Sequence, residues 1–311
     1  MATSVIIKVA TWNMQKGPAL ASTQAQSFLN AGALSARHQV LGFLISDTDI
    51  TFIQESPADI REETQRPDFS AFRAHEKEWV SYDRTHDNQS HRSANRPAFY
   101  SNHTIQALDS PSDCPANGHE DAFRLSAIGR RSTSVGYGVF ISLHATSGWN
   151  AKSNTTDYLS WLCKWLKEDK SCRFAIVGGD FNHRPPHDVA TIEGCAVTFC
   201  FPGGMTQQSG STIDGFCSIC VDPTVTAKWS AAQRVVTGEK DGPIETQMAR
   251  ADPNIGQMHN QRGYLGKVKL GDLPGTVQSL SGSSDMWVRM SDHCAVVGSV
   301  TFTCPDDSVG H

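Results

Sequence analysis

Short apolar runs that end in acidic, amide or imidazole side chains recur along this sequence, and they constrain the fold more than any other feature. Runs of this length and composition are typical of buried β-strands. We expect strands at 5–11, 48–54, 98–100, 123–128, 138–144, 174–177, 211–221 and 294–302. Apolar residues at helical spacing predict two helices, at about 23–45 and at 154–167.

The alternation of strands with helices and long loops predicts an α/β protein. We expect a four-layer α/β sandwich, in which two mixed β-sheets pack face to face and are flanked by helices. A chain of 311 residues is long enough to form one large domain, so we expect a single domain over 1–311. The polar stretches 56–95 and 223–290 lack period-2 alternation. We expect both to lie outside the sheets, the second of them as a long insertion.

The charge and the apolar content limit the classes of partner. The formal net charge is −5, whereas a protein that holds nucleic acid by bulk electrostatics is usually basic. Contact with nucleic acid would therefore be local and bridged by metal ions. No apolar run reaches transmembrane length, and the first residues lack a signal-peptide pattern. The 9 cysteines are an odd number, so the localisation and the redox compartment stay open.

Polar side chains mark five ends of predicted strands, the last of them just before the final strand, and a sixth polar residue, Asp214, lies inside the run 212–216. The six places are Asn13, Gln54-Glu55, His144, Asp180-Phe181-Asn182, Asp214 and Asp292-His293. If these ends converge, the site gathers carboxylates, amides and two imidazoles. Such hard oxygen ligands suit Mg²⁺, Mn²⁺ or Ca²⁺ better than zinc. Two imidazoles, each beside a carboxylate, are what general acid–base chemistry on a phosphodiester needs.

Each of these residues also has a plain structural reading. Glu55 alone is typical of a solvated loop, Asn13 of a turn, and Asp180 of a turn or helix cap. His144 is typical of a core histidine, and Asp292-His293 of a polar strand start. The ordered set therefore carries more weight than any member.

A zinc site is the alternative that the cysteines suggest. Cys217 and Cys220 form a CxxC, with Cys195 and Cys200 nearby. Because residues three apart on a strand face opposite sides, buried thiols or disulfides are the stronger expectation.

The ordered motifs resemble the endonuclease/exonuclease/phosphatase superfamily, whose type member is deoxyribonuclease I. They are ATWN (10–13), IQE (53–55), LHA (143–145), GDFN (179–182), ID (213–214) and SDH (291–293). Within that superfamily, VATWNMQ (9–15), DFNHRP (180–185) and the histidine at 144 resemble the branch of the active nuclease subunit of cytolethal distending toxin. Two departures stand out. No glutamate lies between Asn13 and Glu55, and the interval from Asp214 to Asp292 is longer than in that branch.

The resemblance implies roles for individual residues. Glu55, Asp292 and Asn13 would hold the metal, and Asp180 and Asn182 would position the attacking water and the phosphate or leaving oxygen. His144 and His293 would be the acid–base imidazoles, with Asp214 orienting His293. Arg124 and Arg96 match arginines that contact phosphate, and Arg130 and Arg131 compete with Arg124 for that match.

The function that the resemblance implies is Mg²⁺-dependent phosphodiester hydrolysis, with DNA endonuclease activity of the genotoxin type. One alternative keeps the fold and changes the substrate to a phosphoinositide, which a phosphatase would hydrolyse. Another is a catalytically inactive binding module. The resemblance also implies DNA as substrate, toxin delivery subunits as partners and a secreted effector that acts in a host nucleus. No Lys/Arg-rich targeting run accompanies these implications.

Overall fold

A computed structural model of the chain describes a set of segments that together contain both β-sheets. These are residues 2–14, 41, 44–45, 47–56, 78–81, 96–108, 127–145, 147, 151–169, 171–204, 206–207, 211–235, 267–269, 287–289 and 293–305. For residues 56, 78–81, 96, 235, 267–269 and 287–289 the description covers the backbone alone.

The first sheet joins the two ends of the described chain. Its strands are β1 (Thr3–Asn13), β2 (Ile50–Ser56), β3 (Glu78–Ser81), β4 (Arg96–Ser101), β12 (Thr226–Trp229), β13 (Gln233–Val235) and β16 (Ala295–Cys304). Within the described residues their order is β12-β16-β1-β2-β4-β3, and β13 also pairs with β16. The β1–β2 pair is parallel and the other pairs are antiparallel, so the sheet is mixed.

The second sheet is also mixed. Its strands are β5 (Gln106–Leu108), β6 (Ala127–Thr133), β7 (Gly136–His144), β8 (Cys172–Asp180), β9 (Val189–Ile192), β10 (Cys195–Cys200) and β11 (Asp214–Cys220). Their order is β5-β6-β7-β8-β11-β10-β9, with β7 and β8 parallel. The short strands β14 (Lys267–Lys269) and β15 (Trp287–Arg289) pair only with each other in the described part of the chain.

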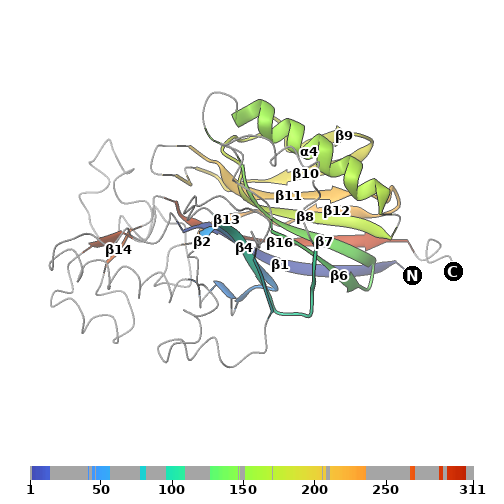
Figure 1. Cartoon of the computed structure of the whole chain (residues 1–311), viewed down its shortest axis with the longest axis horizontal. Coiled ribbons are helices and arrows are strands. Elements are labelled where there is room, and N and C mark those ends of the chain that lie inside the picture. Colours follow the sequence, from blue (N-terminus) through green and yellow to red (C-terminus); the bar gives the residue numbers. More distant parts are fainter. Residues whose placement is uncertain are drawn as a thin grey trace, which may run out of the picture.

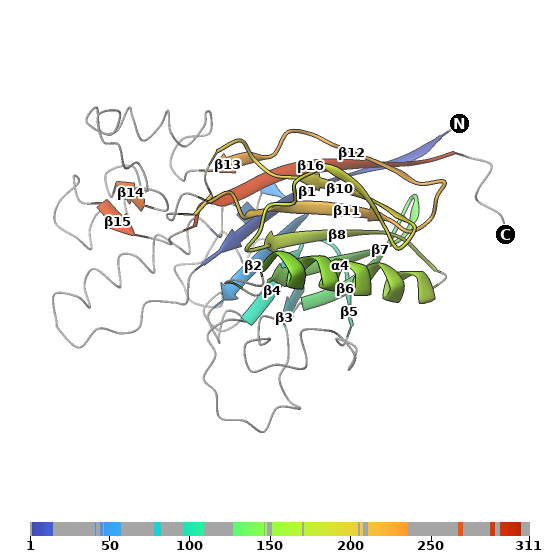
Figure 2. The ribbon, with the colours of Figure 1, turned by 90° about the horizontal axis from the view of Figure 1, so that it is seen from above.

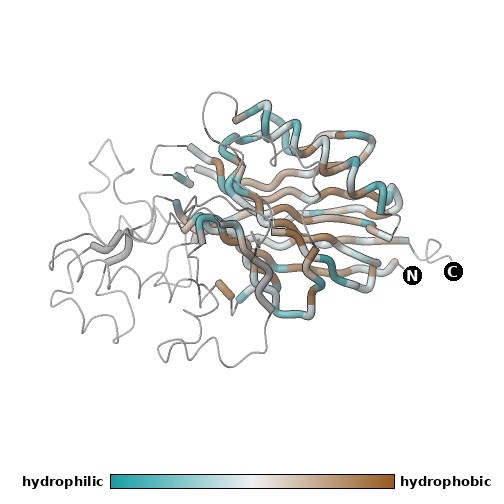
Figure 3. Tube along the Cα trace, in the orientation of Figure 1, coloured by the Kyte–Doolittle hydropathy of each residue, from teal (hydrophilic) through white to brown (hydrophobic). Residues whose placement is uncertain are grey.

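The two sheets pack face to face over a shared apolar core. Phe52 and Phe99 of the first sheet belong to the same buried cluster as Phe140 and Phe174 of the second. Figure 3 shows the hydrophobic residues running along the strands of both sheets. A Cβ atom on Gly178 would lie 2.1 Å from Cδ2 of Phe52, so only glycine lets the two sheets approach this closely here. The glycine at 178 therefore allows strand β8 to pack close to Phe52 of the first sheet.

Helix α4 (Ala151–Glu168) covers the outer face of the second sheet (Figures 1 and 2). Its buried positions follow helical spacing, and Leu159, Leu162 and Leu166 share a cluster with Val139 and Val177 of the sheet. The helix predicted at 154–167 is therefore confirmed with slightly wider bounds. Among the described residues, no helix has the length and apolar character needed to span a lipid bilayer.

The sequence predicts helices on both outer faces, and the layer over the first sheet stays a prediction. Leu41, Leu44 and Ile45 are helical and buried. The rest of the stretch at 23–45 lies outside the described residues. Two mixed sheets and the helix over the second one are thus established, and the fourth layer is not.

The expectation that 56–95 and 223–290 lie outside both sheets is wrong in three places. Strand β3 pairs with β4, and β12 and β13 pair with β16, all along the margins of the first sheet. These strands have only three or four residues each, too few for a period-2 pattern to emerge from the sequence. Trp229 of β12 is partly buried and packs against the shared core, with its ring stacked on Phe216 at a centroid distance of 5.4 Å.

The two cysteines of the CxxC lie on opposite faces of β11, as their spacing predicts. Cys217 belongs to the cluster under α4, and Cys220 belongs to the cluster between the sheets. Both are buried free thiols, as are Cys195 and Cys200. Two thiols on opposite faces of one strand cannot share a tetrahedral zinc ion, so the zinc reading does not fit this strand.

Candidate active site

The candidate site occupies the end of the core between the sheets, where the inward-facing positions change from apolar to polar. Along β8, Phe174 and Ile176 face the first sheet, and continuing the period-2 pattern brings Asp180 to the same face. The register of the neighbouring strands places His144 of β7 and Asp214 of β11 opposite Asp180. In the first sheet, Asn13 ends β1 on the face that Ile7 and Val9 occupy. The fold therefore directs the polar ends of four strands toward one another.

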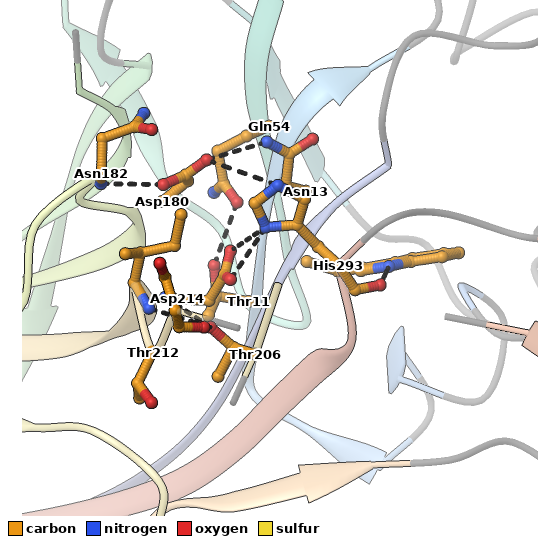
Figure 4. A network of polar contacts seen from close by, with 12 residues as sticks. Thr11, Asn13, Gln54, Asp180, Asn182, Thr206, Thr212, Asp214 and His293 are labelled. Atoms are coloured by element: carbon orange, nitrogen blue, oxygen red, sulfur yellow. Dashed lines mark hydrogen bonds and ion pairs between the residues drawn. The ribbon is translucent and has the colours of Figure 1, made fainter. Parts of the chain in front are cut away.

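Asp180 lies at the centre of this group. Its Oδ2 atom is 3.7 Å from Nε2 of His144 and 3.8 Å from Nε2 of His293. The side-chain amide of Asn13 donates to the same oxygen at 3.0 Å, and the backbone N–H of Asn182 donates to Oδ1 at 2.8 Å (Figure 4). One carboxylate thus stands between two imidazoles and is held by two donors.

His293 and Asp214 form a buried pair. Nδ1 of His293 lies 2.8 Å and 3.0 Å from the two carboxylate oxygens of Asp214, whose side chain is fully buried. We assign the imidazole proton to Nδ1, because an ionised carboxylate can only accept. This leaves Nε2, on the side of Asp180, for proton exchange with a substrate. The hydroxyl of Thr206 accepts the backbone N–H of Asp214 at 3.0 Å and so fixes the start of β11.

Glu55 completes the group from the first sheet. Its Oε1 atom lies 3.7 Å from Nε2 of His144, and the amide of Asn13 approaches it at 3.4 Å. Glu55 has φ of 51°, in the left-handed region that non-glycine residues rarely adopt. Its side chain is 15% exposed, against 2–4% for His144, Asp180 and His293, so the site opens to solvent on the Glu55 side.

The electrostatics of the group favour a cation. Burial raises the pKa of the Asp180 carboxyl, the charge of Asp214 raises it further, and His293 opposes the shift. Asp180, Asp214 and His293 each offer a ligand atom within 4.8 Å of the others, a spacing that one metal ion could bridge. Glu55 and Asn13 add oxygen-bearing side chains beside Asp180. The donor set is rich in hard oxygen atoms and contains no thiolate, and it fits a divalent cation such as Mg²⁺.

The structure brings together most of the residues that the sequence singles out. Seven of them lie in this group, namely Asn13, Glu55, His144, Asp180, Asn182, Asp214 and His293. Asp292 and Arg124 lie outside the described residues. Arg96 is described by its backbone alone, which pairs with Ser56 next to Glu55.

Arg130 and Arg131 lie away from the site. Arg130 pairs with Val139, five residues before the end of β7, and this offset corresponds to roughly 17 Å along the strand. Its guanidinium binds Asp169 at 3.0 Å and lies over the ring of Tyr137. Arg131, the next residue of β6, pairs with Gly138 one residue farther from that end. Both arginines therefore lie away from the polar strand ends of the site.

Thr206 and Trp12 support the site, and sequence reasoning assigned them no role. Thr206 is fully buried and accepts the N–H groups of Ile213 and Asp214. The indole N–H of Trp12 lies 3.4 Å from the carbonyl oxygen of His293. No local pattern marks Thr206, because its partners are 7 and 8 residues away in the chain. Trp12 precedes Asn13 in the ATWN motif, and this position beside a predicted site residue is the one feature of the sequence that points to its supporting role.

Comparison of the sequence with protein-family models and with curated proteins gives no match. Solved structures do match. An endonuclease/exonuclease/phosphatase from Bacteroides vulgatus is similar at a TM-score of 0.55 and 14% identity, over 95% of this chain and 98% of that one. TDP2 of D. rerio, solved as a complex with a single-strand DNA product, is similar at a TM-score of 0.52 and 12% identity, over 95% and 98% of the two chains.

CdtB, the biologically active subunit of cytolethal distending toxin, is similar at a TM-score of 0.47 and 14% identity, over 94% of this chain and 96% of that one. The toxin subunit is thus not singled out among the matches. Together with the two mixed sheets described above, the matches at higher TM-score show that this chain has the fold of the endonuclease/exonuclease/phosphatase proteins.

Proposed function

We propose that this protein is a divalent-metal-dependent phosphodiesterase of the endonuclease/exonuclease/phosphatase superfamily and that its substrate is DNA. One observation carries the proposal. Asp180 stands between two imidazoles, at 3.7 Å and 3.8 Å, and one of these is oriented by Asp214 at 2.8 Å. Two proton-transfer groups around a central carboxylate can serve both the attacking and the leaving oxygen of a phosphodiester.

The geometry suggests how the side chains divide the work. Asp214 holds the Nδ1 proton of His293, so Nε2 accepts a proton from the attacking water. Asp180, within reach of that Nε2 atom, holds the water in position. His144, on the other side of Asp180, delivers a proton to the leaving oxygen. The backbone at Asn182, fixed through Asp180 Oδ1, borders the position of the phosphate.

Among the described residues we propose that Glu55 and Asn13 hold the cation, and Asp292 would join them. Asp214 and His293 are engaged with each other and keep the proton-transfer role. A bound Mg²⁺ would neutralise charge that develops on the phosphoryl oxygens. Mn²⁺ or Ca²⁺ would bind the same oxygen donors. We propose phosphate contacts for Arg124 and Arg96, because a guanidinium binds two phosphate oxygens at once.

DNA is the preferred substrate class because the sequence resembles a nuclease branch and because TDP2 of D. rerio, which shares the fold, was solved with a single-strand DNA product. A phosphoinositide remains the second candidate, since the same imidazoles and cation would serve a phosphate monoester. The toxin branch, its delivery subunits and action in a host nucleus rest on the motifs at 9–15 and 180–185. We further propose that 1–311 forms one domain, since β1 pairs with β16.

A two-substrate assay tests the proposal. Purified protein is incubated with supercoiled plasmid or with a phosphoinositide, each with Mg²⁺ and with EDTA. The proposal predicts Mg²⁺-dependent nicking that EDTA abolishes. Phosphate release from the lipid without nicking would move the substrate to the second candidate. Inactivity on both substrates, with a folded and Mg²⁺-binding protein, would favour the binding module.

A further inference from the structure

Three buried polar side chains link the two sheets directly beneath the site. They are Thr11 of β1, Gln54 of β2 and Ser142 of β7, all with 0% exposure. The Thr11 hydroxyl donates to Oε1 of Gln54 at 3.2 Å, and Nε2 of Gln54 donates to the Ser142 hydroxyl at 3.0 Å. The Ser142 hydroxyl donates in turn to the carbonyl oxygen of Ile53 at 2.9 Å. We call these three residues the inter-sheet clamp; Figure 4 shows Thr11 and Gln54 beside Asn13.

The clamp adjoins a break in strand alternation. Phe52 faces the second sheet, so Gln54 faces it too, and regular alternation would turn Glu55 away. Glu55 nevertheless reaches His144 of the second sheet at 3.7 Å. The left-handed φ of 51° at Glu55, together with a shift in the β2–β4 pairing between Ile53 and Ser56, allows two consecutive side chains to face the same way.

Such a backbone conformation is unfavourable and persists only where neighbouring contacts enforce it. The clamp supplies these contacts on the side of Gln54. The Ser142 hydroxyl holds both the side chain of Gln54 and the carbonyl of Ile53, and the amide of Met14 donates to the carbonyl of Gln54 at 2.9 Å. Each bond joins the end of β2 to a neighbouring strand, so the residue that precedes Glu55 is fixed from two sides.

We propose that Gln54 and Ser142 are positioning residues, which hold the left-handed turn at Glu55 and thereby keep its carboxylate beside His144. Neither touches the substrate or the cation. Their effect on the cation rests on the proposed function, in which Glu55 is a ligand. Their effect on the backbone at Gln54 does not. The effect of the clamp on the backbone at Gln54 can therefore be measured without metal, whereas its effect on cation binding can be measured only with metal.

Ser142→Ala removes the hub of the clamp, and the chain offers a matched control. Ser218 of β11 is also a serine of the second sheet with 0% exposure, and its hydroxyl accepts an inter-sheet hydrogen bond, at 3.0 Å from the indole of Trp229. It pairs with Ile176, four residues before Asp180 on β8. Ser218→Ala therefore deletes an inter-sheet hydrogen bond away from the site, whereas Ser142→Ala deletes the two hydrogen bonds of the clamp hydroxyl.

The test measures three quantities on the full-length wild type and both variants. They are the exchange rate of the Met14 amide in metal-free protein, the Mg²⁺ affinity by calorimetry, and kcat and KM for plasmid nicking. For Ser142→Ala we expect the exchange rate of the Met14 amide to rise about tenfold, as loss of the buried hydrogen bonds of Ser142 allows. We expect Mg²⁺ affinity and kcat to fall on the order of tenfold, as for other residues that orient a metal ligand. Ser218→Ala should leave all three within about twofold, although it also loses a buried hydrogen bond and some thermal stability.

Equal effects of the two substitutions, or unchanged Met14 exchange in folded Ser142→Ala, would overturn the proposal. Gln54→Met provides a second route, because it keeps the length of the side chain and removes its hydrogen bonds; it should reproduce the effects of Ser142→Ala. If the wild type neither binds Mg²⁺ nor nicks DNA, the proposed function fails, while the Met14 exchange rates still decide whether the clamp holds the backbone.

Discussion

At the scale of single residues, the pair of His293 and Asp214 decides what the site can do. Asp214 is fully buried, and both of its oxygens lie within 3.0 Å of Nδ1 of His293. A carboxylate in this position fixes the tautomer and the orientation of the ring. The same pairing leaves Nε2 of His293 facing Asp180 at 3.8 Å. A histidine that served only to begin the last strand would not need this orientation.

The catalytic reading of His293 makes a quantitative prediction. His293→Ala should lower the nicking rate on the order of 10²–10⁴-fold, the usual contribution of a general acid–base group, with a cooperative thermal transition retained. Asp214→Asn should be milder, because the ring is misoriented but still present. Nicking rates and thermal unfolding measured on the same preparations distinguish the readings. A folded His293→Ala variant that nicks within a few-fold of wild type would exclude the role.

At the scale of elements, the site consists of polar residues at the ends of strands, on the face that points into the core. The sequence predicts this arrangement. Asn13, His144 and Asp180 each follow a buried strand on the face that period-2 alternation assigns to the core. The turn at Glu55 could not be predicted, because tertiary contacts rather than a local glycine impose its left-handed φ. Strands β3, β12 and β13 escaped prediction because backbone pairing at a sheet margin needs no apolar pattern.

The close packing of Gly178 against Phe52 predicts that one added methyl group lowers the stability of the fold. Gly178→Ala would place Cβ 2.1 Å from the buried ring of Phe52, and no flexible side-chain end can move aside. We expect the free energy of unfolding to fall by about 1–3 kcal/mol, the usual range for overpacking a core. Gly203→Ala is the control, because nothing lies within 4 Å of its added Cβ. Chemical denaturation of both variants measures the difference, and equal stabilities would contradict the packing.

At the scale of the whole molecule, buried thiols are distributed through both cores. Cys200 and Cys220 belong to the core between the sheets, and Cys163, Cys195 and Cys217 to the core under α4. Burial raises the pKa of each of these thiols, so the reactive thiolate is scarce near neutral pH. Cys172 behaves in the same way. These thiols therefore report whether the complete sandwich is assembled.

Thiol titration tests that assembly. At pH 8, the eight described cysteines, all buried, should resist an aromatic disulfide reagent in the native protein and react rapidly after unfolding in denaturant. Addition of Zn²⁺ should not change the native count, because Cys217 and Cys220 face different cores. Rapid native reaction of more than one thiol would contradict the burial of these cysteines.

We propose that the polar strand ends of the two sheets form a metal-dependent phosphodiesterase site. The most direct measurement is the nicking of supercoiled plasmid by wild type and His293→Ala, each with Mg²⁺ and with EDTA. The site geometry predicts that the wild type nicks only with Mg²⁺ and that the folded variant is at least about a hundredfold slower. Nicking that persists in EDTA, or that His293→Ala leaves unchanged, would contradict the account.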